Sequence, residues 1–458
     1  MNLFSKKDNE KNTINPQEPT YELLQVNNKK IELQQTAEKT SSDGGLLLLK
    51  EVEEQIKLIK DLTNCIKDKR NQKYIKHELY SLLNQRIFQI AAGYEDTNDC
   101  DSLNTDSIFK LCAGKLPSES SLSSQPTMCR FENSVTNSDL YRMAACFANK
   151  FIASYETEPA VIILDCDDTN NNAYGNQQLS IFNNYYNESC FMPLHVYEGL
   201  SGKLITTILK PGRRSKSVNI FSILKRIIHF IRKSWKNTLI LLRGDSHFCS
   251  SDFINWKENQ EKIGYITGLS GNPILRKLSE TTIQSAENKY KKNQMPVKMY
   301  HTFEYKANSW QESQRVIVKV EVNYRGTNIR YIVTDQRQFR TKKLYETGYC
   351  KRGKMELYIK EHKTYLKSDR TSCNSFKANQ FRLFLHSAAY VLIHSLQQNI
   401  FYGTKFYKAT KRTIQLKIIK TAAHVKELKT KIKIIFPSAN PQKNLLANSF
   451  NIFEVLRN

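Results

Sequence analysis

Three acidic positions of the chain lie in patterns that would bring carboxylates together. Asp167 closes the apolar run VIILDCD at 161–167, with Asp165 two residues earlier, and Asp245 closes the run TLILLRGD at 238–245. Glu356 is the third, within YCKRGKMELYIKEHK at 349–363. Carboxylates gathered in one site need a neutralising cation, and Mg²⁺ prefers hard oxygen ligands. Two such ions about 3.5–4 Å apart activate an attacking oxygen and stabilise a leaving one, so these acids indicate phosphoryl transfer.

The strand period leaves the first acid of this set open. Residues i and i+2 of a strand point to one face, so Asp165 and Asp167 could share a site, while Asp168 is expected to point away. A single aspartate after a strand is more often a solvated turn residue or a helix cap. Two strands that end in this way favour a common site.

The segment at 349–363 would place cations around its carboxylate. In a helix, Arg352, Glu356, Lys360 and Lys363 fall near one face at steps of four, four and three. As ordinary ion pairs on a wet helix they would contribute roughly a few tenths of a kcal/mol each. As functional groups, the cations would hold DNA phosphates while Glu356 completes the metal site.

The elements that must position these residues alternate between strand and helix. Strands are predicted at 161–167, 192–199, 203–210, 238–245 and 265–269, and helices at 219–236 and about 251–262. The sequence therefore predicts an α/β core, with a first part at 156–272 and a second part at 349–400 that carries Glu356. Between them, residues 273–348 contain a predicted hairpin around Arg325 and are interpreted as a β-rich insertion.

The two ends of the chain differ from this core. Residues 1–44 are polar and predict a disordered tail, whereas residues 45–155 have apolar positions at helical spacing. We interpret 45–155 as a helical DNA-binding region. Residues 401–458 form a basic C-terminal region, because 401–436 hold ten Lys or Arg against the single acid Glu427.

The charge of the chain predicts a polyanionic partner. It has 69 Lys or Arg against 44 Asp or Glu, a formal charge of +25, which suits a DNA backbone. Residues 199–244 hold eleven cations and no acid. The predicted phosphate contacts are Arg213, Arg214 and Lys216 in the loop PGRRSKS, followed by the C-terminal Lys405, Lys408, Lys411, Arg412, Lys417 and Lys420.

Other classes of protein and site fit poorly. No apolar run is long enough for a membrane span, and no secretory signal is visible. Ten dispersed cysteines without a CxxC pair argue against a zinc ribbon or a disulfide framework and favour reduced thiols in the cytoplasm. Trp310 could stack on an unpaired base, although a core tryptophan is the commoner role.

Tyr349, Arg352, Glu356 and Lys363 reproduce the YREK signature of the DDE transposases of bacterial insertion sequences. The segments GLLLLKEVEEQIKL, QRIFQIAAGYEDTNDCDSL, SSQPTMCRFEN, LDCDDTNNNAYGNQQ, LLRGDSHF and DRTSCNSFKANQFRLFLHSAAYVL also resemble motifs of the insertion sequence thirteen-eighty family. Together the matches cover about residues 44–436. The chain departs from the family pattern at Asn104, Asn171 and Tyr174, which bears on specificity more than on chemistry.

The resemblance implies a ribonuclease H-like catalytic core interrupted by the β-rich insertion, and cut-and-paste DNA transposition with two Mg²⁺ ions, for which Mn²⁺ could substitute. It implies Asp245 and Glu356 as the second and third acids, and Asp167, in a D-x-T motif, as the first, with Asp165 as the alternative. Tyr349, Arg352, Lys360 and Lys363 would contact DNA. The partners would be terminal inverted repeats, target DNA and a second copy of the chain, in a cytoplasmic, nucleoid-associated setting.

Two other functions remain compatible with these residues. One is a purely hydrolytic nuclease on the same fold, which cleaves without strand transfer. The other is a domesticated, catalytically silent DNA-binding protein. Inverted repeats flanking the coding region would favour a mobile element, and their absence would favour the domesticated protein.

Overall fold

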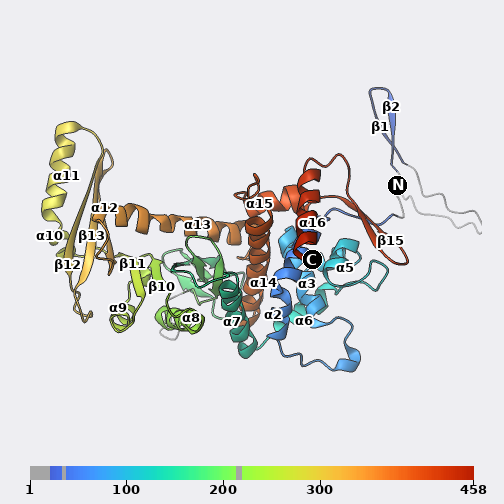
Figure 1. The fold of residues 1–458 in the computed structure, drawn as a ribbon, viewed down its shortest axis with the longest axis horizontal. Helices are drawn as coiled ribbons and strands as arrows, with labels where there is room; N and C mark the ends of the chain where they lie inside the picture. Colours follow the sequence, from blue (N-terminus) through green and yellow to red (C-terminus); the bar gives the residue numbers. More distant parts are fainter. Residues whose placement is uncertain (1–20, 34–37, 213–218, 458) are drawn as a thin grey trace, which may run out of the picture.

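A large mixed sheet forms the centre of one half of the structure (Figure 1). The computed structural model describes residues 21–33, 38–212 and 219–457. The eight strands lie in the order β12-β13-β14-β11-β10-β4-β8-β9, and β10 runs parallel to both β4 and β11 while the other pairs are antiparallel. This mixed α/β architecture agrees with the predicted fold class at that level.

The five predicted core strands are confirmed. They are β4 (Val161–Asp168), β8 (Leu194–Glu198), β9 (Leu204–Ile208), β10 (Leu239–Gly244) and β11 (Ile263–Leu269). Along β4, Ile162, Leu164 and Cys166 face one hydrophobic core, so the odd-numbered Asp165 and Asp167 face the other side of the sheet. A further small sheet of β5 (Asn171–Asn172), β6 (Ile181–Asn183) and β7 (Glu188–Phe191) follows β4 and was not predicted.

Helices cover both faces of the central sheet. The predicted amphipathic helix is α8 (Ile220–Ser234), whose Leu224, Ile228 and Ile231 pack in one core with α9 (Ser251–Lys257) and the even-numbered residues of β4. The opposite face meets α13 (Gly353–Lys360) and α14 (Phe376–Ser395). The helix α14 is buried almost throughout, as its continuous apolar sequence predicted.

The N-terminal region is helical, as expected. It comprises α1 (Leu46–Ile56), α2 (Leu58–Asn64), α3 (Leu79–Ala92), α4 (Asp99–Leu103), α5 (Ser107–Cys112), α6 (Gln125–Asn133) and α7 (Asn137–Ala153). Its apolar residues share one core with α14, and α3 packs directly on that helix. The helical body therefore consists of residues from both ends of the chain.

The insertion adds strands to the central sheet. Its hairpin is β13 (Gln314–Asn323) and β14 (Gly326–Thr334), as predicted, and β12 (Val297–Tyr305) pairs with β13. Because β14 pairs with β11, the insertion continues the same sheet. Two helices, α10 (Pro273–Leu278) and α11 (Glu280–Asn293), precede these strands and were not predicted.

A continuous helical segment links the insertion to the helical body (Figure 1). It begins with α12 (Thr341–Lys343), passes through a π-helical turn (Leu344–Tyr349) and a 3-10 turn (Cys350–Arg352), and continues as α13. A second π-helical turn (Glu361–Tyr365) follows. The acid Glu356 thus lies on a helix held at both ends, with irregular turns on either side.

The expected disorder of residues 1–44 is wrong for the part that the structure describes. A hairpin forms from β1 (Tyr21–Val26) and β2 (Lys29–Leu33), and β3 (Thr40–Ser41) pairs with β15 (Ala423–Glu427). These short strands gain backbone partners that polar composition alone does not reveal. The C-terminal region adds α15 (Lys411–Ile414), β16 (Ile432–Ile435) and α16 (Lys443–Arg457).

All ten cysteines are unpaired thiols. Among the described residues, no helix has the length and apolar content needed to cross a bilayer.

Candidate active site

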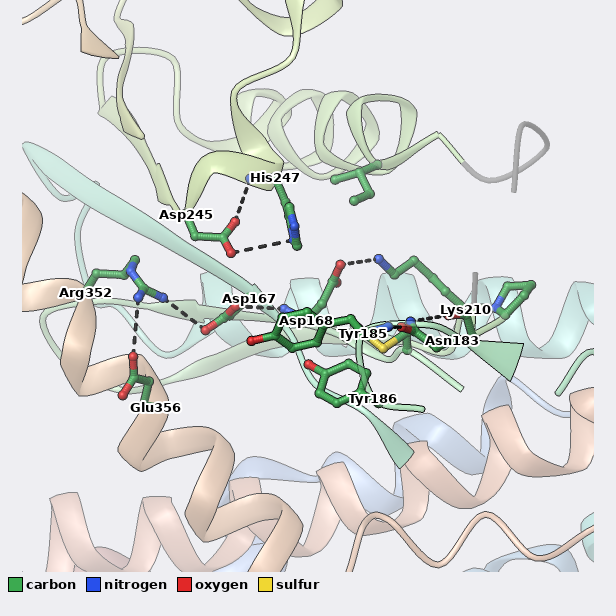
Figure 2. Close-up of a pocket in the computed structure, with 14 residues that line it drawn as sticks. Asp167, Asp168, Asn183, Tyr185, Tyr186, Lys210, Asp245, His247, Arg352 and Glu356 are labelled. Carbon is green, nitrogen blue, oxygen red and sulfur yellow. Dashed lines mark hydrogen bonds and ion pairs between the residues drawn. The ribbon is translucent and has the colours of Figure 1, made fainter. Parts of the chain in front are cut away.

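A pocket of about 690 Å³ lies where the carboxyl ends of β4 and β10 meet α13 (Figure 2). The two strands are parallel neighbours, so the acids that follow them lie at one edge of the sheet. Asp167, Asp245 and Glu356 all line this pocket. The structure therefore brings together the three carboxylates singled out in the sequence, from three separate elements.

Asp167 is the most enclosed of these three carboxylates. Its side chain is 17% exposed, and Oδ2 accepts a hydrogen bond from Nη1 of Arg352 at 3.1 Å. Burial, together with the charge of Asp245, raises the pKa of Asp167 to about 7, although Arg352 acts in the opposite direction. Burial and a neighbouring like charge both disfavour the ionised form, so the site stabilises a nearby cation.

Asp245 is fixed by a tight turn directly after β10. Its Oδ1 accepts from the backbone N–H of His247 at 2.8 Å, and Nδ1 of His247 lies 3.6 Å from Oδ2. Gly268 of β11 packs against this turn: a Cβ there would lie 2.8 Å from the Ser246 nitrogen and 3.1 Å from the Asp245 carbonyl carbon. Neither His247 nor Gly268 was predicted as a residue of the site, although His247 lies within the segment LLRGDSHF.

Arg352 lies between two of the acids. Its Nη1 contacts Asp167, and its Nη2 donates to Oε1 of Glu356 at 3.3 Å, one helical turn along the same segment (Figure 2). The Glu356 side chain lines the pocket and is 65% exposed. A single guanidinium therefore spans the gap between Asp167 and Glu356 and neutralises part of their charge.

The donor chemistry fits divalent cations, but the carboxylates stand apart. Among the described residues, no group of three or more Asp, Glu, His or Cys side chains lies close enough together to hold a metal ion. Arg352 occupies the space between Asp167 and Glu356, and one oxygen of the adjacent Asp168, Oδ1, is buried without a hydrogen-bond partner. The carboxylate oxygens are hard ligands of the kind that Mg²⁺ prefers, but Arg352 separates two of the three carboxylates in this structure.

Asp165, the alternative first acid, has a different environment. It is fully buried, and its two oxygens accept from Nε and Nη2 of Arg243 on β10 at 2.5 and 2.6 Å. Arg243 also donates to the carbonyl oxygen of Gly348 at 2.7 Å, at the start of the segment that holds Tyr349. Asp165 and Asp167 thus share a face of β4, but Asp167 lines the pocket and Asp165 does not.

Asp168 was expected to point away from the face that Asp165 and Asp167 share, and the structure contradicts this expectation. It lines the pocket, where its Oδ2 accepts from Nζ of Lys210 at 2.6 Å, and both side chains are at most 10% exposed. Alternation fails here because the strand ends at Asp168, and side chains from both faces reach the open edge. Lys210 was missed as a site residue, although its position at the end of a strand before Pro211 was visible.

The remaining residues of the 349–363 segment have distinct contacts. Tyr349 is partly buried, and its hydroxyl lies 3.0 Å from the position that a Cβ of Gly268 would occupy. Lys363 donates to the backbone oxygen of Asn170 and, at 3.1 Å, to its Oδ1, so it anchors the loop after β4. Lys360 is exposed. The cations that were expected on one helix face therefore have different surroundings: Arg352 lies in the pocket, Lys363 binds the loop after β4, and Lys360 is exposed to solvent.

Several predicted DNA contacts lie elsewhere. Arg213, Arg214 and Lys216 lie outside the described residues. Trp310 is 6% exposed and packs edge-on against Tyr305, which agrees with the core role that the sequence favoured over stacking on a base. Lys411 is also buried, where it donates to Gln397 Oε1 at 2.9 Å.

Comparisons with known proteins gave a family match and a weak structural likeness. A family model described as "Transposase DDE domain group 1" matches residues 23–458. A piggyBac transposase synaptic complex with hairpin DNA is structurally similar, with 11% identity and a TM-score of 0.42 over 84% of this chain and 82% of that chain. No curated protein matches the chain.

Proposed function

The chain belongs to the transposase DDE domain group 1 family, and on this premise we propose that it is a cut-and-paste transposase of a bacterial insertion sequence of the thirteen-eighty type. It would cleave DNA at terminal inverted repeats and join the freed ends to target DNA. The observation that carries this proposal is the convergence of Asp167, Asp245 and Glu356 on one pocket beside a cluster of cations.

In this proposal the three carboxylates hold two Mg²⁺ ions, which Mn²⁺ could replace. When bound, such ions supply Lewis acidity to the attacking and leaving oxygens of a phosphodiester. Asp167 and Asp245 come from adjacent parallel strands and form the rigid side of the site. Glu356 is on the helix across the pocket and is the most exposed of the three, so it would complete the site from the movable side.

The basic residues of the pocket would orient the DNA. Arg352, once released from the carboxylates, offers a planar set of N–H donors that suits a phosphate. Lys210 lies on the β9 side of the pocket, held by Asp168. Tyr349 and Lys363 position the turn of Asp245 and the loop after β4, respectively, while the exposed Lys360 would meet the backbone directly.

The rest of the chain would serve this reaction. The mixed sheet with its flanking helices would be a ribonuclease H-like core, and residues 45–155 would read the terminal repeats. Joining two element ends requires two active sites or two binding surfaces, so a homodimer on DNA is the geometric expectation. The protein would act in the cytoplasm, at the nucleoid.

The test is a cleavage assay on duplex DNA that carries the sequences flanking the coding region. If the chain is a transposase, the assay should show Mg²⁺-dependent release of 3′-hydroxyl ends and the formation of joined products with a target plasmid. Chelation of Mg²⁺ should abolish both. Cleavage without joined products would instead identify a hydrolytic nuclease. Binding without cleavage by the wild-type chain would identify a catalytically silent DNA-binding protein.

A further inference from the structure

The antiparallel ribbon of β15 and β16 carries two like charges directly opposite each other. Lys426 and Lys433 are partners in the register, and both side chains are exposed. Among the described residues, no ion pair or side-chain hydrogen bond is found for either amine. The turn that joins the strands is closed by a bond from Leu428 N to Lys431 O at 2.8 Å and adds the exposed Lys429 and Lys431. Like charges directly opposite each other destabilise a strand pair. We therefore expect these lysines to have a function that offsets the cost of their repulsion.

The acid of the ribbon does not neutralise these lysines. The carboxylate of Glu427 accepts from Ser118 N at 2.8 Å and from Ser118 Oγ at 2.7 Å. It shares its face with Val425, Ile432 and Ile434, which pack on the helical core. The pleat therefore directs the acid toward the body of the protein.

The outer face of the ribbon is cationic at the turn end. Lys426 and Lys433 lie on it, followed by His424 and its partner Ile435 toward the other end. On this face an acid, Glu38, lies 3.7 Å from Nε2 of His424. Glu38 thus lies at the end of the ribbon away from the turn, and the four lysines form an unbalanced positive surface.

We propose that this outer face, with Lys426, Lys433, Lys429 and Lys431, binds the sugar-phosphate backbone of duplex DNA. The inference rests on the proposed function and adds a second contact to it. In Figure 1, α3, α5 and α14 lie between the ribbon and the central sheet. The ribbon would therefore hold a stretch of the element end that is distant from the phosphate being cleaved, and contribute to affinity and register without contributing to chemistry.

A simpler explanation assigns the lysines to protection of an edge strand. In the sheet order β16-β15-β3, β16 is an edge, and charged side chains on edge strands prevent pairing between molecules. The two explanations differ in what removal of the charges does. Loss of a DNA contact lowers the salt dependence of binding, whereas loss of edge protection leads to self-association and leaves DNA binding unchanged.

The experiment compares wild type with the double variant Lys426→Gln/Lys433→Gln. Binding of the full chain to a fluorescein-labelled duplex of generic sequence is followed by fluorescence anisotropy at several salt concentrations. Each phosphate contact contributes about 0.9 to the slope of log K against log salt, so the slope should fall by about 1 to 2. The turn variant Lys429→Gln/Lys431→Gln should lower the slope in the same direction.

A charge-matched control is Lys291→Gln/Lys292→Gln on α11, where both lysines are exposed. It should leave the slope unchanged. The thermal midpoint of Lys426→Gln/Lys433→Gln should equal or exceed that of wild type, because a repulsion is removed. Together these results exclude misfolding and a general effect of net charge.

Three outcomes would overturn the inference: an unchanged slope in both ribbon variants, an equal fall in the α11 control, or self-association of the ribbon variants with unchanged DNA binding. Wild-type chain that does not bind duplex DNA would overturn the proposed function as well. Wild-type chain that binds and cleaves, with ribbon variants of unchanged slope, would overturn only the role of the ribbon.

Discussion

The guanidinium of Arg352 donates to Oδ2 of Asp167 at 3.1 Å and so joins the helix of the third acid to the strand of the first, across 185 residues. The same group contacts Glu356. An internal cation therefore occupies the space between two proposed metal ligands. If Asp167 and Glu356 hold a metal ion as proposed, binding of the ion would require Arg352 to leave the space between them.

Replacing Arg352 by Gln should strengthen Mg²⁺ binding in the absence of DNA. The ion pairs are partly exposed, so their loss removes about 1 kcal/mol of competition, or roughly a fivefold change in Kd. Isothermal titration of the full chain with Mg²⁺ measures this change. Lys360→Gln, which removes an exposed charge from the same helix, should change the Kd far less. Weaker Mg²⁺ binding by Arg352→Gln would mean that the guanidinium supports the metal site.

Asp165→Asn and Asp167→Asn should fail in different ways. Asp165 is the buried partner of Arg243, and breaking such a pair costs roughly 3–5 kcal/mol of unfolding free energy. Asp167→Asn should leave the free energy of unfolding nearly unchanged and abolish DNA cleavage. Urea unfolding and a cleavage assay on both variants measure this contrast. If Asp165→Asn is stable but inactive while Asp167→Asn is active, then Asp165 is the catalytic acid and Asp167 is not.

Gly268→Ala should impair cleavage by displacing Asp245. The added methyl group would meet the backbone of Ser246 at 2.8 Å, and a shift of the turn on the order of an ångström costs about ten- to a hundredfold in rate. Gly271→Ala is the control, since its Cβ would meet only the Tyr331 ring at 3.5 Å. Equal cleavage rates for both variants would show that the turn tolerates the methyl group.

Acidification should destabilise the fold through buried histidines. Burial, aided by Arg86 and Arg382, lowers the pKa of His386 well below its ordinary value, and burial does the same for the pKa of His362. The unfolded chain takes up these protons below about pH 6.5, whereas the folded chain does not. Stability is therefore full above that pH and falls below it, by up to about 1.4 kcal/mol per pH unit for each histidine.

Urea midpoints measured between about pH 7.5 and pH 5 follow this loss. His386→Gln should reduce the number of protons taken up on unfolding by up to one, and so make the slope of stability against pH shallower, since the side chain at this position no longer titrates. His301→Gln, at an exposed position on β12, should leave the dependence unchanged. A flat stability curve for wild type across this range would contradict the predicted neutral histidines.

Local patterns in the sequence predicted much of the fold. The apolar runs VIILDCD and TLILLRGD defined β4 and β10, and the acids at their ends lie at one edge because the strands are parallel neighbours. The helical spacing around Glu356 likewise predicted α13. These features depend on residues close in sequence, where periodicity is informative.

Contacts between distant strands could not be predicted in this way. The pairs of Asp165 with Arg243 and of Asp168 with Lys210 depend on the lateral order of β8, β9, β4 and β10, which periodicity does not specify. The π-helical turns beside α13 and the pairing of β3 with β15 likewise arise from tertiary contacts. The sequence therefore named the pocket carboxylates Asp167, Asp245 and Glu356 and the cation Arg352 between two of them, and missed Lys210, which holds Asp168.

The most direct test of the central claim is strand cleavage by Glu356→Gln, with Glu346→Gln, an exposed acid of the same helical segment, as control. On duplex DNA carrying the element ends in Mg²⁺, wild type and Glu346→Gln should release 3′-hydroxyl ends, while Glu356→Gln should bind the duplex with wild-type affinity and release none. Cleavage by Glu356→Gln at the wild-type rate would contradict the assignment of this pocket as the catalytic site.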